Sequence, residues 1–177
     1  MQQSVHGYTF VELLIVVSLI TILAGAAIPG FTNYTRNQNL KQSTAQLKDS
    51  LRSAQNNALG GLKSADAGVG YWGVQFADGT NAYDLYTFSE ALDSFSKEDT
   101  FDPLIGDIEV KNSNVILFDM FTGNAYTTGG SPATPCDANG SNCFVIIGES
   151  DATGAECVSI LANTPGGLLV EEGVTCP

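Results

Sequence analysis

Gly7-Tyr8-Thr9-Phe10-Val11-Glu12 opens an apolar stretch in which Glu12 is the only charged residue before Arg36. The 21 residues from Tyr8 to Ile28 would form a helix about 31 Å long, enough to cross a hydrocarbon core of about 30 Å. A carboxylate near one end of such a helix costs roughly a few kcal/mol unless it has a partner. The stretch therefore predicts a membrane-spanning helix over 8–28 whose acid has a function.

The segment before this helix limits how the chain is exported. Residues 1–7 are too short and too polar to form a secretory signal peptide alone. Ala24-Gly25-Ala26-Ala27, at the far end of the apolar run, would suit a signal peptidase, although a basic segment ahead of the run is missing. Cleavage there is an alternative to a retained helix.

Taken whole, residues 7–17 resemble the class III signal of type IV prepilins and type II secretion pseudopilins: a Gly, four mostly apolar residues, a Glu and a spanning helix. The resemblance implies cleavage after Gly7 by a prepilin peptidase, which also methylates the new Tyr8 amine. It implies that Glu12 pairs with the Tyr8 amine of a neighbouring subunit. Tyr8 stands where Phe is usual, and the leader carries Gln2, Gln3 and His6 instead of Lys or Arg. The expected orientation of the chain in the membrane, with its C-terminal part outside the cytoplasm, is therefore implied by the family resemblance and not by charge.

The chemistry of Glu12 supports this role independently. In lipid, an unpaired carboxylate either stays protonated or meets a cation, and the amine of an adjacent helix is such a cation. That pairing would fix the axial offset between subunits. The alternative is that Glu12 lies at the headgroup level with no role in assembly.

Apolar periodicity continues beyond Pro29. Mostly apolar residues recur at alternating steps of four and three residues, which places them on one face of a helix: Leu40, Thr44, Leu47, Leu51, Ala54 and Ala58. Lys41, Lys48, Asp49 and Arg52 lie off this stripe. One helix from Tyr8 to about Leu59, kinked near Pro29 and ended by Gly60-Gly61, is the prediction. A plain end at Ile28 is the alternative.

Charge is segregated along the chain. Up to Lys63 there are five basic and two acidic residues, and from Ser64 on there are two basic and 17 acidic residues, a net charge of −15. A domain this acidic repels phosphate backbones, so a nucleic-acid partner is not expected.

The remainder reads as a β-rich head over 62–177. Strands are predicted at 71–76, 83–88, 108–110, 115–118, 125–126, 144–147, 157–161 and 168–170, with turns at Asp78-Gly79 and Thr122-Gly123-Asn124. Residues 89–103 are polar and read as a connection with one short helical turn. The predicted fold is α+β: a long helix packed on one largely antiparallel sheet.

The head also resembles H-type minor pseudopilins. In these the helix carries a Leu-x₃-Leu-x-x-Ala-x₃-Ala pattern, as at Leu47, Leu51, Ala54 and Ala58, and a hairpin bearing Trp follows, as at Trp72. The resemblance implies the pilin fold, with a leader (1–7), a transmembrane and filament-core helix (8–28), its amphipathic continuation (29–59) and the head.

Four cysteines lie in the last quarter of the chain, and they permit three pairings. Joining Cys136 to Cys143 would close a polar loop, and joining Cys157 to Cys176 would fasten the C-terminus to an inner strand. Export to an oxidising compartment favours disulfides. A zinc site is the alternative, but no CxxC spacing occurs and the only histidine, His6, is in the leader.

No catalytic residues are predicted, because cleavage after Gly7 removes the only histidine and with it any Ser-His or Cys-His pair. Calcium is the one cofactor considered, since some major pseudopilins bind it near the C-terminus. The candidate ligands have no recognised loop spacing and read as solvated turns: Asp78, Asp84, Glu98, Asp99, Asp102, Glu171 and Glu172.

The sequence thus predicts a non-enzymatic filament subunit of a type IV pilus or a type II secretion pseudopilus. Its expected partners are the prepilin peptidase and methyltransferase, other pilins or pseudopilins, the inner-membrane assembly platform and the bilayer. The expected location is the inner membrane, with a single span, and then a filament in the periplasm or at the cell surface. The alternatives are a membrane-tethered binding protein that forms no filament and an exported hydrolase.

Overall fold

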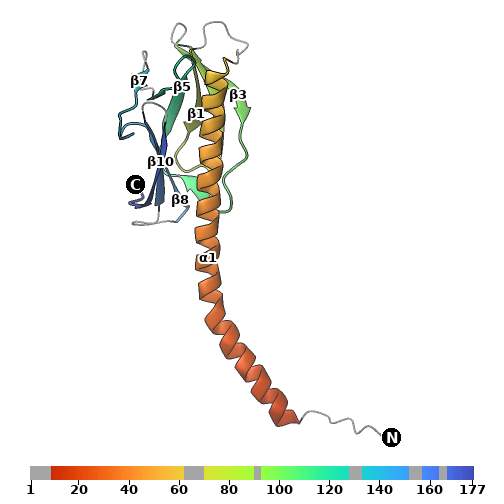
Figure 1. Cartoon of the computed structure of the whole chain (residues 1–177). Helices are drawn as coiled ribbons and strands as arrows, with labels where there is room; N and C mark the ends of the chain where they lie inside the picture. The colour runs from red at the N-terminus through yellow and green to blue at the C-terminus, as the bar shows by residue number, and fades with distance from the viewer. Residues whose placement is uncertain (1–8, 62–69, 90–92, 128–132, 152–156, 164–166) are drawn as a thin grey trace, which may run out of the picture. The chain divides into compact units, whose positions relative to one another are not determined.

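A computed structural model describes residues 9–61, 70–89, 93–127, 133–151, 157–163 and 167–177 (Figure 1). Within the helix, the side chains of residues 26–30 and 33 lie outside the description. The chain divides into two compact units, residues 1–38 and 39–177, and each is described by itself.

A single α-helix, α1 (Phe10–Leu59), belongs to both units and runs without interruption through Pro29. It begins two residues after the predicted start at Tyr8, which is outside the described residues. At its end, the Gly60 and Gly61 amides donate to the carbonyls of Asn56 and Ala58. Gly61 has a φ of 60°, the left-handed conformation that commonly terminates helices. The predicted helix end is therefore confirmed, whereas the kink at Pro29 stays a prediction.

Four of the six residues of the apolar face predicted for the second half of the helix are buried, and Leu40 and Thr44 are half-buried. Leu47, Leu51, Ala54 and Ala58 are each 0% exposed, while Arg52 is exposed. These side chains belong to one core cluster with residues of both sheets. Burying a leucine of this kind contributes roughly 1.5–3 kcal/mol. Helix residues 39–59 are therefore an integral part of the second unit.

Six antiparallel strands form sheet A, in the order β3-β2-β1-β5-β6-β7. They are β1 (Tyr71–Phe76), β2 (Tyr83–Ser89), β3 (Ser94–Thr100), β5 (Asn114–Asp119), β6 (Ala125–Thr127) and β7 (Thr134–Pro135). The turn at Asp78 and Gly79 joins β1 to β2 as predicted. In the centre of the sheet, a side chain at Gly73 would collide with the Ile116 carbonyl, so the close approach of β1 and β5 requires glycine.

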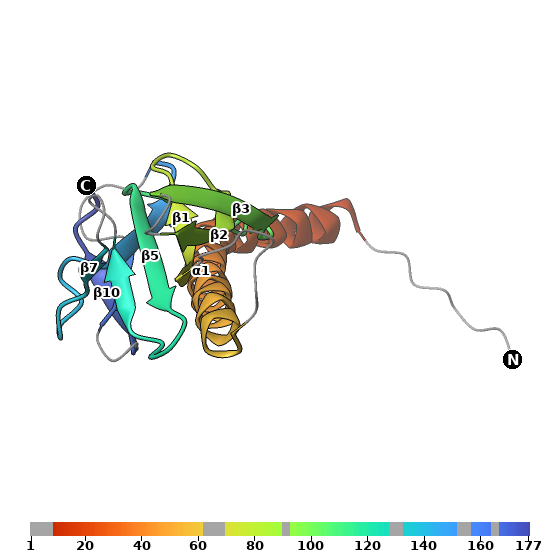
Figure 2. The same ribbon diagram turned by 90° about the horizontal axis from the view of Figure 1, so that it is seen from above.

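Four antiparallel strands form sheet B, in the order β10-β9-β8-β4. They are β4 (Ile108–Val110), β8 (Phe144–Glu149), β9 (Cys157–Ala162) and β10 (Leu168–Val174). Figures 1 and 2 show β10 on the side of the head away from α1. β9, which lies between β10 and β8, is buried along its whole length.

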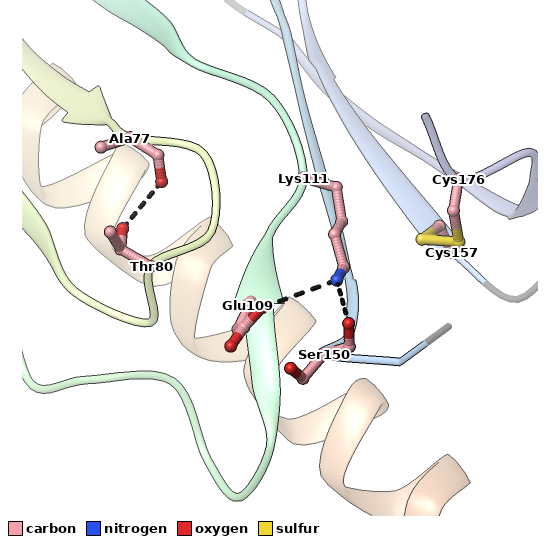
Figure 3. A network of polar contacts seen from close by, with 7 residues as sticks. All are labelled: Ala77, Thr80, Glu109, Lys111, Ser150, Cys157 and Cys176. Atoms are coloured by element: carbon pink, nitrogen blue, oxygen red, sulfur yellow. Dashed lines mark hydrogen bonds and ion pairs between the residues drawn. A yellow bond between two sulfur atoms is a disulfide. The ribbon is translucent and has the colours of Figure 1, made fainter. Parts of the chain in front are cut away.

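Polar contacts join sheet A to sheet B and also link strands within sheet B. The side-chain amides of Asn112 and Asn114 both donate to the Phe144 carbonyl, at 3.1 and 2.8 Å. The Lys111 ammonium lies 3.6 Å from the Glu109 carboxylate and donates to the Ser150 carbonyl at 3.0 Å, which ties the end of β4 to the end of β8 (Figure 3).

The α+β class and the antiparallel strands are confirmed, with three differences from the prediction, one of which is the short strand β7, which was not predicted. The strands form two sheets instead of one. Residues 94–100, predicted as part of an irregular connection, form the edge strand β3. Almost all β3 side chains are exposed, so its polar composition gives no alternating apolar pattern, and its backbone pairing with β2 defines it as a strand.

Two disulfides are present. One joins Cys136 to Cys143, and the other joins Cys157 of β9 to Cys176 near the C-terminus. Figure 3 shows the second bridge. All four cysteines are thereby used, and the structure contains no free thiol.

Candidate assembly segment

The first turn of α1 is fixed by Thr9. Its hydroxyl oxygen accepts the Glu12 amide at 3.2 Å, and its carbonyl accepts the Leu13 amide at 3.1 Å. Threonine is a favoured N-cap because it satisfies amides that have no partner within the helix. The Thr-x-x-Glu spacing signals such a cap, and the sequence analysis missed it. The cap places Glu12 in the first turn, where the helix dipole favours a negative charge.

The Glu12 side chain is exposed. Among the contacts of the described residues, its carboxylate takes part in no hydrogen bond or ion pair. An anionic oxygen pair is therefore available to a cation from outside the chain. In an apolar environment such a pairing is strongly favoured over an isolated charge.

Around Glu12, the helix presents apolar side chains in every direction. Phe10 is 79% exposed, and the other large apolar residues of this segment are also exposed: Val11, Leu13, Leu14, Ile15, Val16, Val17, Leu19, Ile20, Ile22 and Leu23. A helix that is apolar all round is suited to burial in lipid or among other helices. Exposure on this scale marks a surface that other molecules cover.

The two hydroxyl side chains between Phe10 and Gly25 are satisfied within the helix. Ser18 donates to the Ile15 carbonyl at 2.8 Å, and Thr21 lies 2.9 Å from the carbonyls of Val17 and Ser18. This leaves the Glu12 carboxylate as the only side chain of Phe10–Gly25 with an unused polar group. Any polar specificity of the segment therefore comes from Glu12.

Within the part of the chain that the structure describes, no helix meets the length and apolarity needed for a membrane crossing. The membrane-spanning role of residues 8–28 stays a prediction.

The remaining predicted site residues are placed as follows. Gly7 and Tyr8, the cleavage and methylation sites, lie outside the described residues. Pro29 is inside α1, and its side chain is not described. The four cysteines form the two bridges named above.

The carboxylates considered as calcium ligands do not converge. Asp84 lies 2.8 Å from the Lys97 ammonium, and this contact raises the pKa of Lys97. Glu98 accepts the Thr87 hydroxyl at 2.9 Å, and Asp99 accepts the Thr100 amide. Among the described residues, no three His, Cys, Asp or Glu side chains come together as a metal site.

The chain thus combines a long helix, which has an apolar start and an acid in its first turn, with an antiparallel β head. Residues 3–28 match the family described as the prokaryotic N-terminal methylation motif. The chain is also similar to the type IV major fimbrial protein FimA of Dichelobacter nodosus, with 30% identity over 73 residues. That match covers 41% of this chain and 47% of the relative, so the chain spans about half the length of the curated relative it matches. No solved structure matches the chain. The motif and the relative together support the resemblance of this chain to the type IV pilin and pseudopilin superfamily.

Proposed function

We propose that the chain is a structural subunit, a pilin or a minor pseudopilin, of a type IV pilus or a type II secretion pseudopilus. A prepilin peptidase cleaves after Gly7 and methylates the Tyr8 amine. The mature chain is held in the inner membrane by residues 8–28 with its head outside the cytoplasm, and an inner-membrane assembly platform then moves it into the filament. The subunit performs no catalysis.

One observation carries this proposal: an exposed apolar helix whose single unused polar group is the Glu12 carboxylate. In a bundle of such helices the favourable partner of that carboxylate is a positive chain end, and the methylated Tyr8 amine of a neighbouring subunit is one. The pairing sets the axial position of each subunit. The methylation motif and the similarity to a fimbrial protein support the proposal that the chain is a filament subunit.

Replacement of Glu12 tests the proposal. In cells that produce the full chain, Glu12→Ala should abolish incorporation into sedimentable filaments, while the chain stays in the membrane fraction. Asp49→Ala is the matched control, because Asp49 is the other acid of α1 and is also exposed. Normal incorporation of the Glu12→Ala chain would instead support a membrane-tethered binding protein whose helix is only an anchor.

A further inference from the structure

The second half of α1 carries a stripe of basic side chains, Lys41, Lys48 and Arg52, referred to below as the basic stripe. At about 100° per residue these positions fall within about 40° of one another around the helix. Lys41 and Arg52 are exposed and Lys48 is half-buried. None of the three has an ion-pair partner among the described residues. The stripe runs along the helix toward Leu59, which lies about five turns beyond Lys41 on the same side of the helix. The Leu59 side chain is 53% exposed.

The outer edge of sheet B has the opposite charge. Leu169, Val170, Glu171 and Glu172 of β10, referred to below as the acidic edge, are all exposed. β10 is the last strand of its sheet and pairs only with β9. Glu171 and Glu172 form no ion pair within the described residues. The strand is firmly held, because the Cys157–Cys176 bridge fastens the chain just beyond it.

Among the residues that the structure describes, neither surface is neutralised within one copy of the chain. The only two basic residues after Ser64 are Lys97, which pairs with Asp84, and Lys111, which pairs with Glu109 (Figure 3). The basic stripe is on α1, and β10 lies on the side of the head away from α1 (Figures 1 and 2). Among the described residues, no ion pair joins the two complementary surfaces within a single molecule.

We propose that the basic stripe of one copy docks on the acidic edge of a second copy. Both surfaces combine charge with exposed leucine, Leu59 beside the stripe and Leu169 on the edge, so the contact has an apolar part as well as ion pairs. Two different surfaces that bind each other form a heterologous contact, which builds an open filament, unless the rotation closes into a ring, instead of a two-fold dimer. This inference rests on the proposed function and adds to it a contact between heads that is separate from Glu12.

Acidic side chains on an edge strand also have a simpler explanation, since they prevent edge-to-edge aggregation. The two explanations differ in what a charge reversal does. A basic residue at position 172 still protects the edge, but it repels the basic stripe of a second copy.

Charge reversal in the full chain, in cells that assemble it, separates these outcomes. Arg52→Glu and Glu172→Arg alone should each reduce sedimented filament about fivefold, an effect at the upper end for one exposed ion pair. The two changes together should restore assembly. Asp78→Arg is the matched control, because Asp78 is an exposed acid in the β1–β2 turn, away from the acidic edge. Failure of Glu172→Arg to rescue Arg52→Glu, or equal rescue by Asp78→Arg, would overturn the docking.

Disulfide trapping distinguishes a failure of this docking from a failure of the proposed function. Copies carrying Arg52→Cys and copies carrying Glu172→Cys, with different tags, are produced together and oxidised mildly in the membrane. Mixed disulfide dimers should form, and replacing Glu172→Cys by Asp78→Cys should remove them. Dimers without any filament would retain the docking and contradict the filament proposal. Filaments without mixed dimers would support the filament proposal and contradict the docking.

Discussion

The Tyr83 hydroxyl lies 3.1 Å from Ser50 Oγ, so a buried hydrogen bond joins β2 to helix α1 inside the core. Ser50 itself donates to the Gln46 carbonyl at 3.0 Å, which leaves its oxygen to accept the tyrosine proton. Tyr83 is 1% exposed and its ring stacks on Phe101, with centroids 5.3 Å apart. This pair of residues provides a buried polar contact that helps to fix the position of the helix on sheet A.

Removing this hydroxyl should destabilise the fold at neutral pH. Tyr83→Phe loses one buried hydrogen bond while Ser50 keeps its Gln46 partner, so the expected cost is about 1 kcal/mol in the free energy of unfolding. Urea unfolding followed by circular dichroism measures it. Tyr34→Phe, at an exposed position of α1, is the control and should leave the midpoint unchanged. An unchanged midpoint for Tyr83→Phe would contradict the role assigned to this bond.

The same residue predicts how stability depends on alkaline pH. Burial raises the pKa of Tyr83 above its ordinary value of 10.0. Because the unfolded chain then releases this proton at lower pH than the folded chain, the free energy of unfolding falls as pH rises above about 10. Unfolding curves between about pH 9 and about pH 11 should therefore show a smaller loss of stability for Tyr83→Phe than for the natural chain. Equal losses would contradict this account.

Two glycines with similar backbones should respond differently to alanine. Gly79 and Gly140 have φ values of 69° and 71°, so alanine is strained at both. At Gly79 nothing lies within 4 Å of an added Cβ, whereas at Gly140 that atom would lie 2.8 Å from Leu161 Cβ. Gly79→Ala should cost about 1 kcal/mol, and Gly140→Ala should cost clearly more. Thermal unfolding of both variants measures the difference, and equal costs would show that the loop at Gly140 moves freely away from β9.

The two disulfides should contribute unequally to stability. The Cys157–Cys176 bridge closes a separation of 19 residues and the Cys136–Cys143 bridge one of 7. On the chain-entropy account these loops correspond to about 3 and about 2 kcal/mol. Replacing each pair by serines should therefore lower the unfolding midpoint more for Cys157 and Cys176. The reverse order would indicate that β10 is held mainly by its pairing with β9.

The proposed processing at Gly7 predicts a specific mature N-terminus. Native chain isolated from membranes or filaments should begin at Tyr8 and carry one methyl group, an addition of about 14 Da on the N-terminal peptide. Peptide mass spectrometry measures both. A chain that begins at Met1, or at any position beyond Ala24, would exclude prepilin-type processing.

Much of the fold could be predicted from local patterns. The period of Leu47, Leu51, Ala54 and Ala58 predicted the buried helix face, and the Asp78-Gly79 turn predicted the first hairpin. The division into two sheets could not be predicted. It depends on long-range pairings, such as β1 with β5 and β4 with β8, which leave no local pattern in the sequence.

The candidate assembly segment could likewise be predicted only in part from the sequence. The apolar run and its single acid identified Glu12, because charge is rare in such a segment. The Thr9 cap was readable from its spacing but missed. The internal bonding of Ser18 and Thr21 could not be predicted, since a hydroxyl in a helix can turn toward its own backbone or toward a neighbour, and only the structure shows which.

The bonding of Ser18 and Thr21 has a consequence for how a subunit travels. A helix that supplies hydrogen-bond partners for its own hydroxyls exchanges none of those bonds when lipid tails around it are replaced by other helices. On the proposed function, the segment would therefore rotate and slide past its neighbours without breaking these bonds, and the ion pair at Glu12 would set the position at which it stops.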